Sequence, residues 1–399
     1  MSQPIRYVSE LPHSADLVIV GGGVVGAATA FYAARAGLSP LLIERRPALC
    51  TLTTPASTGA FRLQFDNREE LELVRESVEV FLNFEEVTGQ SAYGLGIKQQ
   101  GYLWVTTDEG RAERQRRLVE LQHSWGQTDI EVLDGNEVRR RWPYVTPEVV
   151  QARWRPDDGF LDTKALTMGF VAGSAAQVMV GCAASGFDLN GSRVTGVVTS
   201  AGTVSTDTVV VAAGPFSGAV AARAGIDLPI VTLQRQKIVV PQCELVPADA
   251  PMTIDDDTGA HWRPALGGAY CLFTDPSTPP TPPMEDVPPD HGRALAVLNP
   301  ASPVSVARVA PFWADVWQRN SASWLIHAGQ YTMTPDHRPM LGPTEMEGLW
   351  LNTGYSGHGI MGSTAGSRHL IDVLTGVIPA GDNSFSVDRT FELRDLDLL

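Results

Sequence analysis

The sequence predicts an α/β fold built on a Rossmann-like nucleotide-binding unit, because three features of that unit follow one another near its start. Residues 16–20 (DLVIV) form a short run of mostly branched apolar side chains, which is typical of a buried parallel strand. A glycine turn follows, and residues 24–36 are rich in alanine, with Gly37 placed to end the helix that they predict. Residues 41–44 predict a second strand. This order of elements predicts one βαβ unit.

The glycine turn has the spacing Gly21-x-Gly23-x-x-Gly26. The first glycine permits the tight turn, the second lets the backbone approach a pyrophosphate, and the third lets the helix pack closely on the strand. Glu44 ends the second strand, near the offset of about 20 residues at which an acid binds a ribose hydroxyl. The pattern predicts a dinucleotide site, and the alternative is a glycine-rich turn in an ordinary αβ unit. The predicted contacts here are Gly21, Gly23, Val25, Gly26, Glu44 and Arg45.

The composition is typical of a globular protein with a large core. Of the 399 residues, 43% are apolar and 19% are charged, and the formal net charge is −15. This charge argues against nucleic acid or an anionic membrane as the main partner. The four cysteines are scattered, without the paired spacing of a metal site, and fit the cytoplasmic location that we expect. The first apolar run, residues 17–30, is interrupted by four glycines and is too short to span a bilayer.

Periodicity and proline content predict the elements that follow. Seven prolines between residues 275 and 290 predict a loop. The predicted helices cover residues 68–88, 111–122, 163–180 and 363–374, and the predicted strands cover residues 102–106 and 350–353, with hairpin strands over residues 194–211.

Four further motifs occur in a fixed order: residues 57–62 (STGAFR), 209–214 (VVVAAG), 334–342 (TPDHRPMLG) and 354–361 (GYSGHGIM). Together with the N-terminal βαβ unit, they resemble the D-amino-acid oxidase superfamily of flavoproteins, in its sarcosine oxidase and glycine oxidase branch. The resemblance covers nearly the whole chain, and several weak motifs in the right order make one strong signal. It implies that the dinucleotide is FAD.

The resemblance implies an α/β, Rossmann-like FAD-binding domain with a second, mixed-sheet α+β substrate domain. The expected FAD-binding domain comprises residues 1–90, 150–220 and 329–399, and the expected substrate domain comprises residues 91–149 and 221–328.

In the family, the loop that corresponds to residues 354–361 and the helix after it wrap the flavin. We expect that helix to begin near Ser363, where its N-terminus would stabilise negative charge on the reduced flavin. The FAD contacts that the resemblance adds are Ser57, Thr58, Gly59, Arg62, Ala213, Gly214, Gly357, His358, Gly359, Ile360 and Met361.

The resemblance also implies the residues of the active site. Arg62 matches a family arginine near the flavin and would tune it electrostatically; the alternative is an ion pair with a nearby acid. His358 belongs to the cofactor-wrapping loop, so we expect it to contact FAD or pack the loop rather than act as an acid or base. The residues expected at catalytic positions are Arg62, His261 and Tyr331, and those expected to line the substrate pocket are Gln64, Phe65, Arg263 and Met361.

The chain departs from its relatives where they attach FAD. Monomeric sarcosine oxidases use a cysteine where this chain has Gly329, and other relatives use a histidine near the Ser57 segment, whereas residues 40–122 contain no histidine. We therefore expect non-covalent FAD. Leu272 occupies the place of a lysine that relatives use to promote the reaction of reduced flavin with oxygen, which leaves both oxidase and dehydrogenase open.

The basic residues that hold the substrate carboxylate in the family, called carboxylate clamps below, are missing as well. Phe65 and Met361 stand where monomeric sarcosine oxidases have an arginine and a lysine. Two interpretations stay open: a larger, more apolar substrate pocket, or core packing by both side chains. Alternation along a strand would direct Arg235 and Lys237 to one face. The candidates for a relocated clamp are Arg235, Lys237, His261, Arg263 and Arg338.

These features predict FAD-dependent oxidation of the C–N bond of an amino acid or N-substituted amino acid. Hydride would pass to flavin N5, the imine would hydrolyse, and O2 or another acceptor would reoxidise the flavin. The substrate would be larger and more apolar than sarcosine. The alternatives are oxidation of an α-hydroxy acid and a flavin-binding assembly factor without turnover. We expect a small amine or amino acid as partner and no nucleic acid, membrane or metal, and we leave the oligomeric state open.

Overall fold

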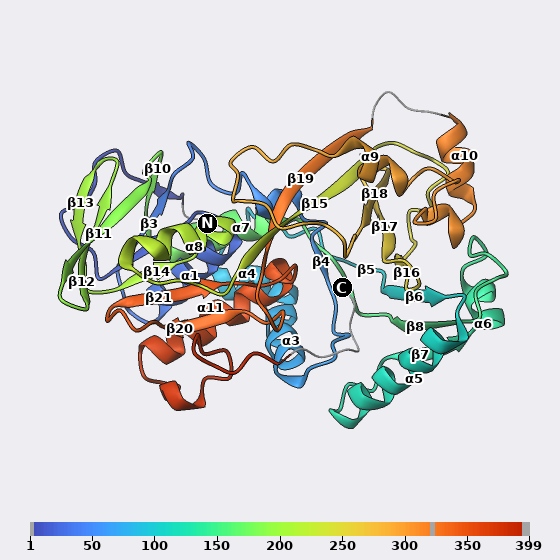
Figure 1. The fold of residues 1–399 in the computed structure, drawn as a ribbon, viewed down its shortest axis with the longest axis horizontal. Helices are drawn as coiled ribbons and strands as arrows, with labels where there is room; N and C mark the ends of the chain where they lie inside the picture. The colour runs from blue at the N-terminus through green and yellow to red at the C-terminus, as the bar shows by residue number, and fades with distance from the viewer. Residues whose placement is uncertain (1–3, 320–323, 393–399) are drawn as a thin grey trace.

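The computed structural model describes residues 4–319 and 324–392. Two large sheets organise this part of the chain: a mostly parallel sheet of seven strands and a mixed sheet of eight strands. Figure 1 shows them in two lobes, with the long strands β15 (Val231–Val240) and β19 (Leu325–Met333) reaching from the boundary into the second lobe. The fold confirms the predicted combination of a Rossmann-like unit with a mixed-sheet second layer.

The seven-stranded sheet is parallel except at one edge, where β20 pairs antiparallel with β21. The two strands of the N-terminal βαβ unit are its third and fourth, and all four residues of β2 are buried. In spatial order, the strands are β1 (Arg6–Tyr7), β10 (Gln177–Val180), β3 (Pro40–Glu44), β2 (Leu17–Val20), β14 (Val209–Val211), β21 (Leu349–Thr353) and β20 (Met340–Pro343).

Helix α1 (Val24–Arg35) packs against β2 because two glycines allow a close approach. A Cβ added at Gly26 would lie 1.9 Å from the carbonyl oxygen of Gly21, so only glycine fits there. Gly37, just beyond the end of the helix, has φ +86°, the left-handed conformation predicted for this position.

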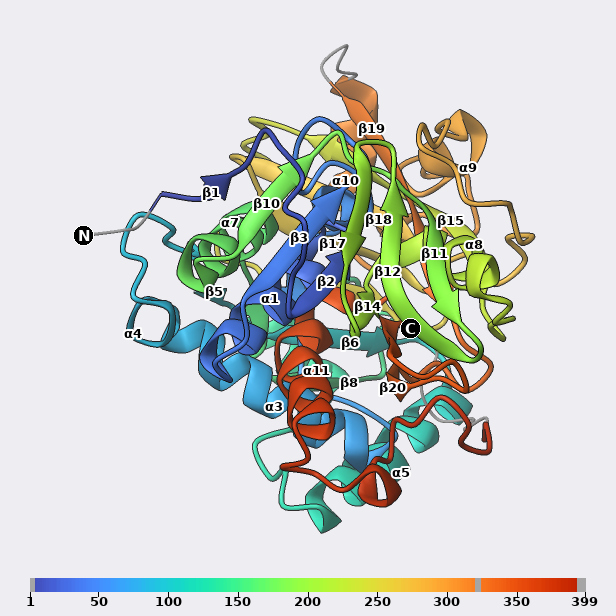
Figure 2. The ribbon, with the colours of Figure 1, turned by 90° about the vertical axis from the view of Figure 1, so that its left-hand side faces the viewer.

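Helices cover one face of the seven-stranded sheet, and a small antiparallel sheet covers the other, as Figure 2 shows. Helix α1 packs on α7 and α11, and α11 packs on α3, around one apolar core. Valines of β12 and β13 bury the opposite face against β2 and β14. The bounds of these elements are α3 (Arg68–Leu82), α7 (Thr163–Ser174), α11 (Gly359–Leu374), β11 (Ala184–Asn190), β12 (Arg193–Thr199) and β13 (Gly202–Ser205).

The eight-stranded sheet is antiparallel except between β16 and β6. One of its faces packs with α9 and α10 around Ile238, Trp262 and Trp313. Strand β8 and all of β19 lie in this sheet. The boundary predicted at residue 150 would assign β8 to the FAD-binding domain, and the boundary predicted at residue 329 would divide β19 between the two domains. The boundaries themselves stay a prediction. In spatial order, the strands are β19, β15, β18 (Gly268–Phe273), β17 (Ala260–Ala265), β16 (Met252–Asp255), β6 (Tyr102–Thr106), β8 (Gln151–Arg155) and β7 (Glu131–Asp134).

Short elements complete the two lobes. One of them is a three-stranded sheet with the strand order β4-β9-β5. Its strands are β4 (Ala60–Phe61), β9 (Gly159–Phe160) and β5 (Lys98–Gln99). The remaining helices are α2 (Thr53–Ala56), α4 (Phe84–Thr88), α5 (Glu109–Ser124), α6 (Gly135–Arg141), α8 (Ser217–Ala221), α9 (His291–Ala296) and α10 (Phe312–Arg319), with 3-10 turns at Gly214–Phe216, Ala222–Ala224, Val306–Arg308 and Ala380–Asp382.

Two predicted helices are too long. The helix predicted over residues 68–88 is broken at Asn83, whose side-chain amide donates to the carbonyl of Glu79 and ends α3. The helix predicted over residues 163–180 ends at Ser174, because Ala175 is left-handed with φ 52° and the apolar residues after it pair with β3 as strand β10. Apolar periodicity alone does not distinguish a helix end from a short buried strand.

Two further predictions differ in their details. The hairpin predicted over residues 194–211 comprises only β12 and β13, since Val209–Val211 belongs to the centre of the parallel sheet. Helix α11 begins at Gly359 rather than near Ser363. Its early glycines have low helix propensity, but Gly366 lies where any Cβ would be 2.3 Å from the Tyr355 hydroxyl, so packing requires them.

The remaining predicted elements are confirmed. Strand β6 has the predicted bounds, α5 extends the predicted helix by two residues at each end, and residues 275–290 form a loop whose one bridge pair joins Pro280 to Leu233. The predicted late strand, residues 350–353, is β21.

We predict that Gly26→Ala lowers the free energy of unfolding by about 1–3 kcal/mol, because the new methyl group forces α1 away from β2. Urea denaturation would measure the change. Gly94→Ala is the matched control, because no atom lies within 4 Å of its added Cβ, and it should change stability by less than about 0.5 kcal/mol. Equal losses in both variants would contradict the close-approach interpretation.

Candidate functional site

A long cavity runs along the carboxyl ends of the parallel strands. It begins at the turn after β2 and at the end of β3, passes the residues that follow β14, and ends beside β19 and the loop before α11. This edge is where nucleotides bind in open α/β sheets. Seven glycines line the cavity, so a ligand can approach the backbone along much of its length. They are Gly21, Gly22, Gly23, Gly214, Gly354, Gly357 and Gly359.

Hydrogen bonds brace the glycine turn from two sides. The Glu44 carboxylate accepts from the backbone N–H of Gly22 at 2.7 Å and of Arg46 at 2.8 Å. The Thr54 hydroxyl accepts from the Val24 N–H at 3.2 Å. The N-terminus of α1 is thus held at the cavity, where its dipole favours a phosphate. Of the residues predicted at this end, Gly21, Gly23, Val25, Glu44 and Arg45 line the cavity, and Gly26 packs behind it.

The proline-rich loop ties the end of β3 to β19. Arg45 stacks over the Phe216 ring at 4.4 Å and forms an ion pair with Glu285 of the loop. Arg46 donates to the Glu285 carbonyl at 2.9 Å. Further along, the side-chain oxygen of Gln330, a residue that lines the cavity, accepts from the Met284 N–H at 2.8 Å.

The far end of the cavity is formed by the glycine loop before α11. Gly357 has φ +97°, and a Cβ there would lie 2.8 Å from the ring of Tyr331, so the ring packs directly on the backbone. Because α11 begins at Gly359, the N–H groups of its first turn lie four residues earlier than predicted. Of the predicted contacts, Ala213, Gly214, Gly357, Gly359 and Ile360 line the cavity, whereas His358 and Met361 do not.

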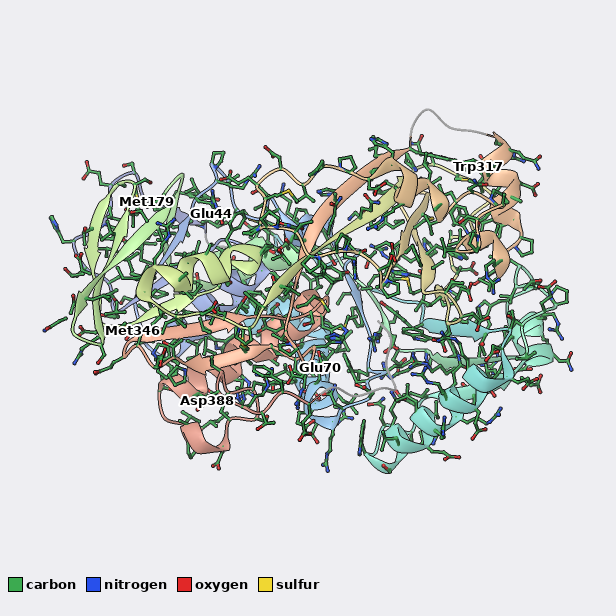
Figure 3. The ribbon with its side chains drawn as sticks, viewed as in Figure 1. Glu44, Glu70, Met179, Trp317, Met346 and Asp388 are labelled. Carbon is green, nitrogen blue, oxygen red and sulfur yellow. The ribbon has the colours of Figure 1, made fainter. Side chains whose placement is uncertain are left out.

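Behind this loop, a buried chain of polar groups joins Glu70, His358 and Arg62. His358 Nδ1 lies 2.6 Å from a carboxylate oxygen of Glu70, and its Nε2 lies 3.3 Å from the Arg62 guanidinium. Arginine only donates, so Nε2 is the acceptor and the proton is on Nδ1. This neutral imidazole orients its neighbours and is not placed to act as a base at the cavity. Figure 3 shows Glu70 near the boundary between the lobes.

Two buried cations hold the segment that follows α2. Lys237 Nζ donates to the carbonyl oxygens of Pro55 at 2.9 Å and Ser57 at 2.5 Å, and the guanidinium of Arg263 donates to the carbonyl of Thr58 at 2.8 Å. Burial, followed by the charge of Arg263, lowers the pKa of Lys237 to about 8. Ser57 lines the cavity, so these strands of the second sheet lie directly across from it.

Gly59 completes this segment. It has φ +72°, and a Cβ there would meet the Leu161 carbonyl oxygen at 2.2 Å. Its function is therefore to turn the chain beside β9. Neither Thr58 nor Gly59 lines the cavity, although both were predicted to contact FAD.

The three residues predicted at catalytic positions approach from different strands. Tyr331 lines the cavity, and burial raises the pKa of its phenol, which stays protonated at neutral pH. His261 is paired with Leu272 across β17 and β18, and burial lowers the pKa of its imidazole. Arg62, 3% exposed, lies at the end of β4 with its guanidinium 4.7 Å from the Phe65 ring. Only Tyr331 of the three reaches the cavity surface.

Two of the residues predicted for the substrate pocket lie in the core. Phe65 is fully buried and packs edge-on against His358, with ring centroids 5.3 Å apart, and Met361 belongs to the same apolar cluster. Gln64 donates to Asp158 at 2.9 Å and accepts from Arg153 at 3.2 Å. The packing interpretation of Phe65 and Met361 is therefore favoured, because neither side chain lines the cavity.

Sequence reasoning missed four residues that shape the site. Thr54, Phe216 and Gln330 line the cavity, and Glu70 bonds His358. Asn67 and Glu70 have the spacing of a capping pair, and Asn67 does accept from the Glu70 N–H at 2.8 Å. That signal marks the start of α3 but carries no information about the contact with His358, which depends on how the helices pack.

Residues 16–373 match the protein-family model described as DAO, FAD dependent oxidoreductase. The chain therefore belongs to this family of FAD-dependent oxidoreductases, whose enzymes are amino-acid oxidases and dehydrogenases. Its glycine-lined cavity at the carboxyl ends of parallel strands fits the dinucleotide that the family binds.

Similar proteins include both curated sequences and solved structures. Human mitochondrial sarcosine dehydrogenase is 26% identical over 362 residues, which cover 88% of this chain and 38% of the relative, so the chain spans about two fifths of that protein. L-proline dehydrogenase from P. horikoshii is 24% identical, with a TM-score of 0.81 over 94% of this chain and 98% of the other. Glycine oxidase from Geobacillus kaustophilus is 21% identical, with a TM-score of 0.80 over 96% of this chain and all of the other.

Among the described residues, no helix is both long and apolar enough to cross a bilayer.

We predict that Glu70→Ala destabilises the protein by about 1–3 kcal/mol, because it removes the carboxylate that accepts from the buried His358 Nδ1–H. Thermal and urea denaturation of the FAD-loaded protein would measure the loss. Glu72→Ala, two residues along the same helix, removes only an exposed pair with Arg68 and should cost less than about 1 kcal/mol. Similar costs for the two variants would show that the buried contact contributes little.

Proposed function

We propose that this member of the FAD-dependent oxidoreductase family oxidises the C–N bond of an amino acid or N-substituted amino acid. The observation that carries the proposal is the position of one end of the cavity, at Tyr331 and Ser57, against a sheet face that bears cations and aromatic rings. A zwitterionic substrate has a carboxylate that such a face can bind and a C–H bond that it can orient.

FAD, when bound, supplies the chemistry: it accepts hydride from the carbon beside the nitrogen and leaves an imine that water hydrolyses. The residues of this chain would position the reactants. The first turn of α11 would favour negative charge at the flavin end of the cavity, and the α1 N-terminus would hold the pyrophosphate. Ser57, Gly357 and Ile360 would enclose the ring, and Tyr331 would close the cavity toward the substrate. Water exclusion at this end would strengthen each of these interactions.

The names of the similar proteins support the amino-acid class. They include enzymes named for sarcosine, dimethylglycine, proline and glycine. The proposal does not extend to the parts of the longer relatives that this chain does not cover. A substrate larger and more apolar than sarcosine stays a prediction. The cytoplasmic location stays a prediction as well.

Two alternatives make different predictions for one experiment. An anaerobic screen of amino acids, N-substituted amino acids and α-hydroxy acids would follow the loss of oxidised-flavin absorbance. Bleaching by an amino acid supports the proposal, bleaching only by a hydroxy acid supports α-hydroxy-acid oxidation, and no bleaching by any compound favours an assembly factor. A matched amino acid and hydroxy acid with the same side chain would make the comparison direct.

We propose that FAD is bound without a covalent bond. Gly329 occupies the attachment position of monomeric sarcosine oxidases, and a Cβ there would lie 2.8 Å from the Ala56 methyl group, so α2 packs directly against this glycine. We predict that acid precipitation leaves all FAD in the supernatant, as absorbance and protein-bound fluorescence would show. Flavin that stays with the precipitate would refute non-covalent binding.

We also propose that O2 reoxidises the flavin, with Lys237 as the cation that assists. Lys237 pairs across strands with Leu272, so its ammonium group lies beside the position where relatives carry their lysine. A fixed positive charge beside the cavity favours electron transfer to O2, because the product of that transfer is an anion. Another electron acceptor stays open if replacement of Lys237 does not change the rate of reoxidation by O2.

The pKa of about 8 sets the expected pH dependence. Lys237 is charged below that pH and neutral above it, so the rate of reoxidation by O2 should fall as pH rises through about 8. We predict that Lys237→Met slows this step by about 100-fold and removes the pH dependence. Lys237→Arg, which keeps the charge, should stay fast at high pH. Stopped-flow mixing of reduced protein with O2 would measure all three proteins.

A further inference from the structure

One face of the eight-stranded sheet carries five cations toward the seven-stranded sheet. Directly opposed residues of antiparallel strands share a face, and the pairs Lys237–Leu272, Arg263–Tyr270 and Leu233–Tyr331 place these side chains together. The opposite face is apolar and packs on α9 and α10. The cations are Arg153, Arg155, Arg235, Lys237 and Arg263.

Four of these cations are engaged by the protein itself. Arg155 forms ion pairs with Asp158 and Asp129, both at 2.7 Å. Arg153 donates to Gln64 and stacks over Trp104 at 4.1 Å. Lys237 and Arg263 donate to the main-chain carbonyls of the segment 55–58. Arg338, a further candidate for a clamp, lies two residues before the edge strand β20 and is bound to Asp336 at 3.1 Å.

Arg235 differs from the other four. Its one hydrogen bond goes from NH1 to the carbonyl of its own neighbour Gln234, and its Nε is buried without an acceptor among the described residues. The carboxylate of Asp275 lies near Arg235 but forms its ion pair with Arg293 instead. Burial lowers the pKa of Arg235, so its charge is poorly solvated. Arg235 is half-buried, and a guanidinium whose Nε is withdrawn from water without an acceptor is stabilised by an anionic ligand.

The direction of the side chain follows from its neighbours. Gln234 and Gln236 donate to Pro288 and Asp290 of the proline-rich loop, so the alternate residue Arg235 points to the other face. Its guanidinium lies 5.7 Å from the ring centre of Tyr331, which lines the cavity. The residue paired with it on β19 is Gly329, which adds no side chain to compete for the space.

We propose that Arg235 binds the substrate carboxylate, beside the Tyr331 phenol, in place of the clamps that this chain lacks. The inference rests on the proposed function, and it specifies which residue makes the enzyme selective for amino acids over simple amines. A guanidinium suits this role because its fork of N–H donors matches both carboxylate oxygens. In the described structure, both Nε and the terminal nitrogens of Arg235 lack a carboxylate.

Calorimetric titration of the FAD-loaded protein with benzoate, and with benzamide as its uncharged counterpart, tests this assignment without turnover. We predict that the wild type binds benzoate more tightly than benzamide. Arg235→Gln should weaken benzoate binding by roughly 10- to 150-fold and leave benzamide unchanged. Arg140→Gln removes an exposed cation of α6 that pairs with Glu137 and should change neither affinity.

Three results would overturn the assignment: no binding of benzoate by the wild type, equal benzoate affinity in Arg235→Gln, or an equal loss for both ligands. If Arg235→Gln does not retain FAD, Arg235→Lys serves in its place, since it keeps the charge but not the fork and should give an intermediate preference for benzoate; an unchanged preference would overturn the proposal. Arg235-dependent benzoate binding in a protein that oxidises no amino acid would contradict the proposed function and not this site.

Discussion

The contact between Gly26 and the carbonyl of Gly21 determines how the rest of the structure is arranged. Because a Cβ added at Gly26 would lie 1.9 Å from the Gly21 carbonyl oxygen, only a glycine allows α1 to lie this close to β2. That position sets where α7 and α11 pack, since both lie on α1. It also brings the N-terminus of α1 to the end of the strand, where Glu44 and Thr54 hold the turn open toward the cavity.

The second sheet is joined to this arrangement by an unusual kind of contact. Buried lysine and arginine side chains most often meet carboxylates, but Lys237 and Arg263 end on the carbonyl oxygens of Pro55, Ser57 and Thr58. A carbonyl dipole satisfies the hydrogen bonds and leaves the net positive charge in place. The sheet face opposite the cavity therefore retains a positive potential, which suits an anionic or zwitterionic ligand in a protein whose formal charge is −15.

The parts that could be predicted from sequence are those where one local pattern has one physical meaning. The Gly21-x-Gly23-x-x-Gly26 turn is such a pattern, because strand, turn, helix and second strand must all occur in order. The glycines of α11 are not, because their purpose is to admit the ring of Tyr355, a contact invisible without the packing. For the same reason the sequence alone could not assign Phe65 and Met361 to a pocket or to the core. Nor could it show which of the five inward cations bind groups of the protein itself, because their acceptors come from distant parts of the chain.

The order of strands in the seven-stranded sheet has a consequence for how the protein is made. Strands β1, β2 and β3 leave the ribosome first, but the neighbouring strands β10, β14 and β21 come from residues 177–353, and the glycine loop and α11 come later still. The two ends of the cofactor cavity are thus encoded more than 300 residues apart. During synthesis the strand edges of the nascent N-terminal unit stay exposed until these later segments arrive, so wrong pairing at those edges is the main hazard on the way to the folded protein.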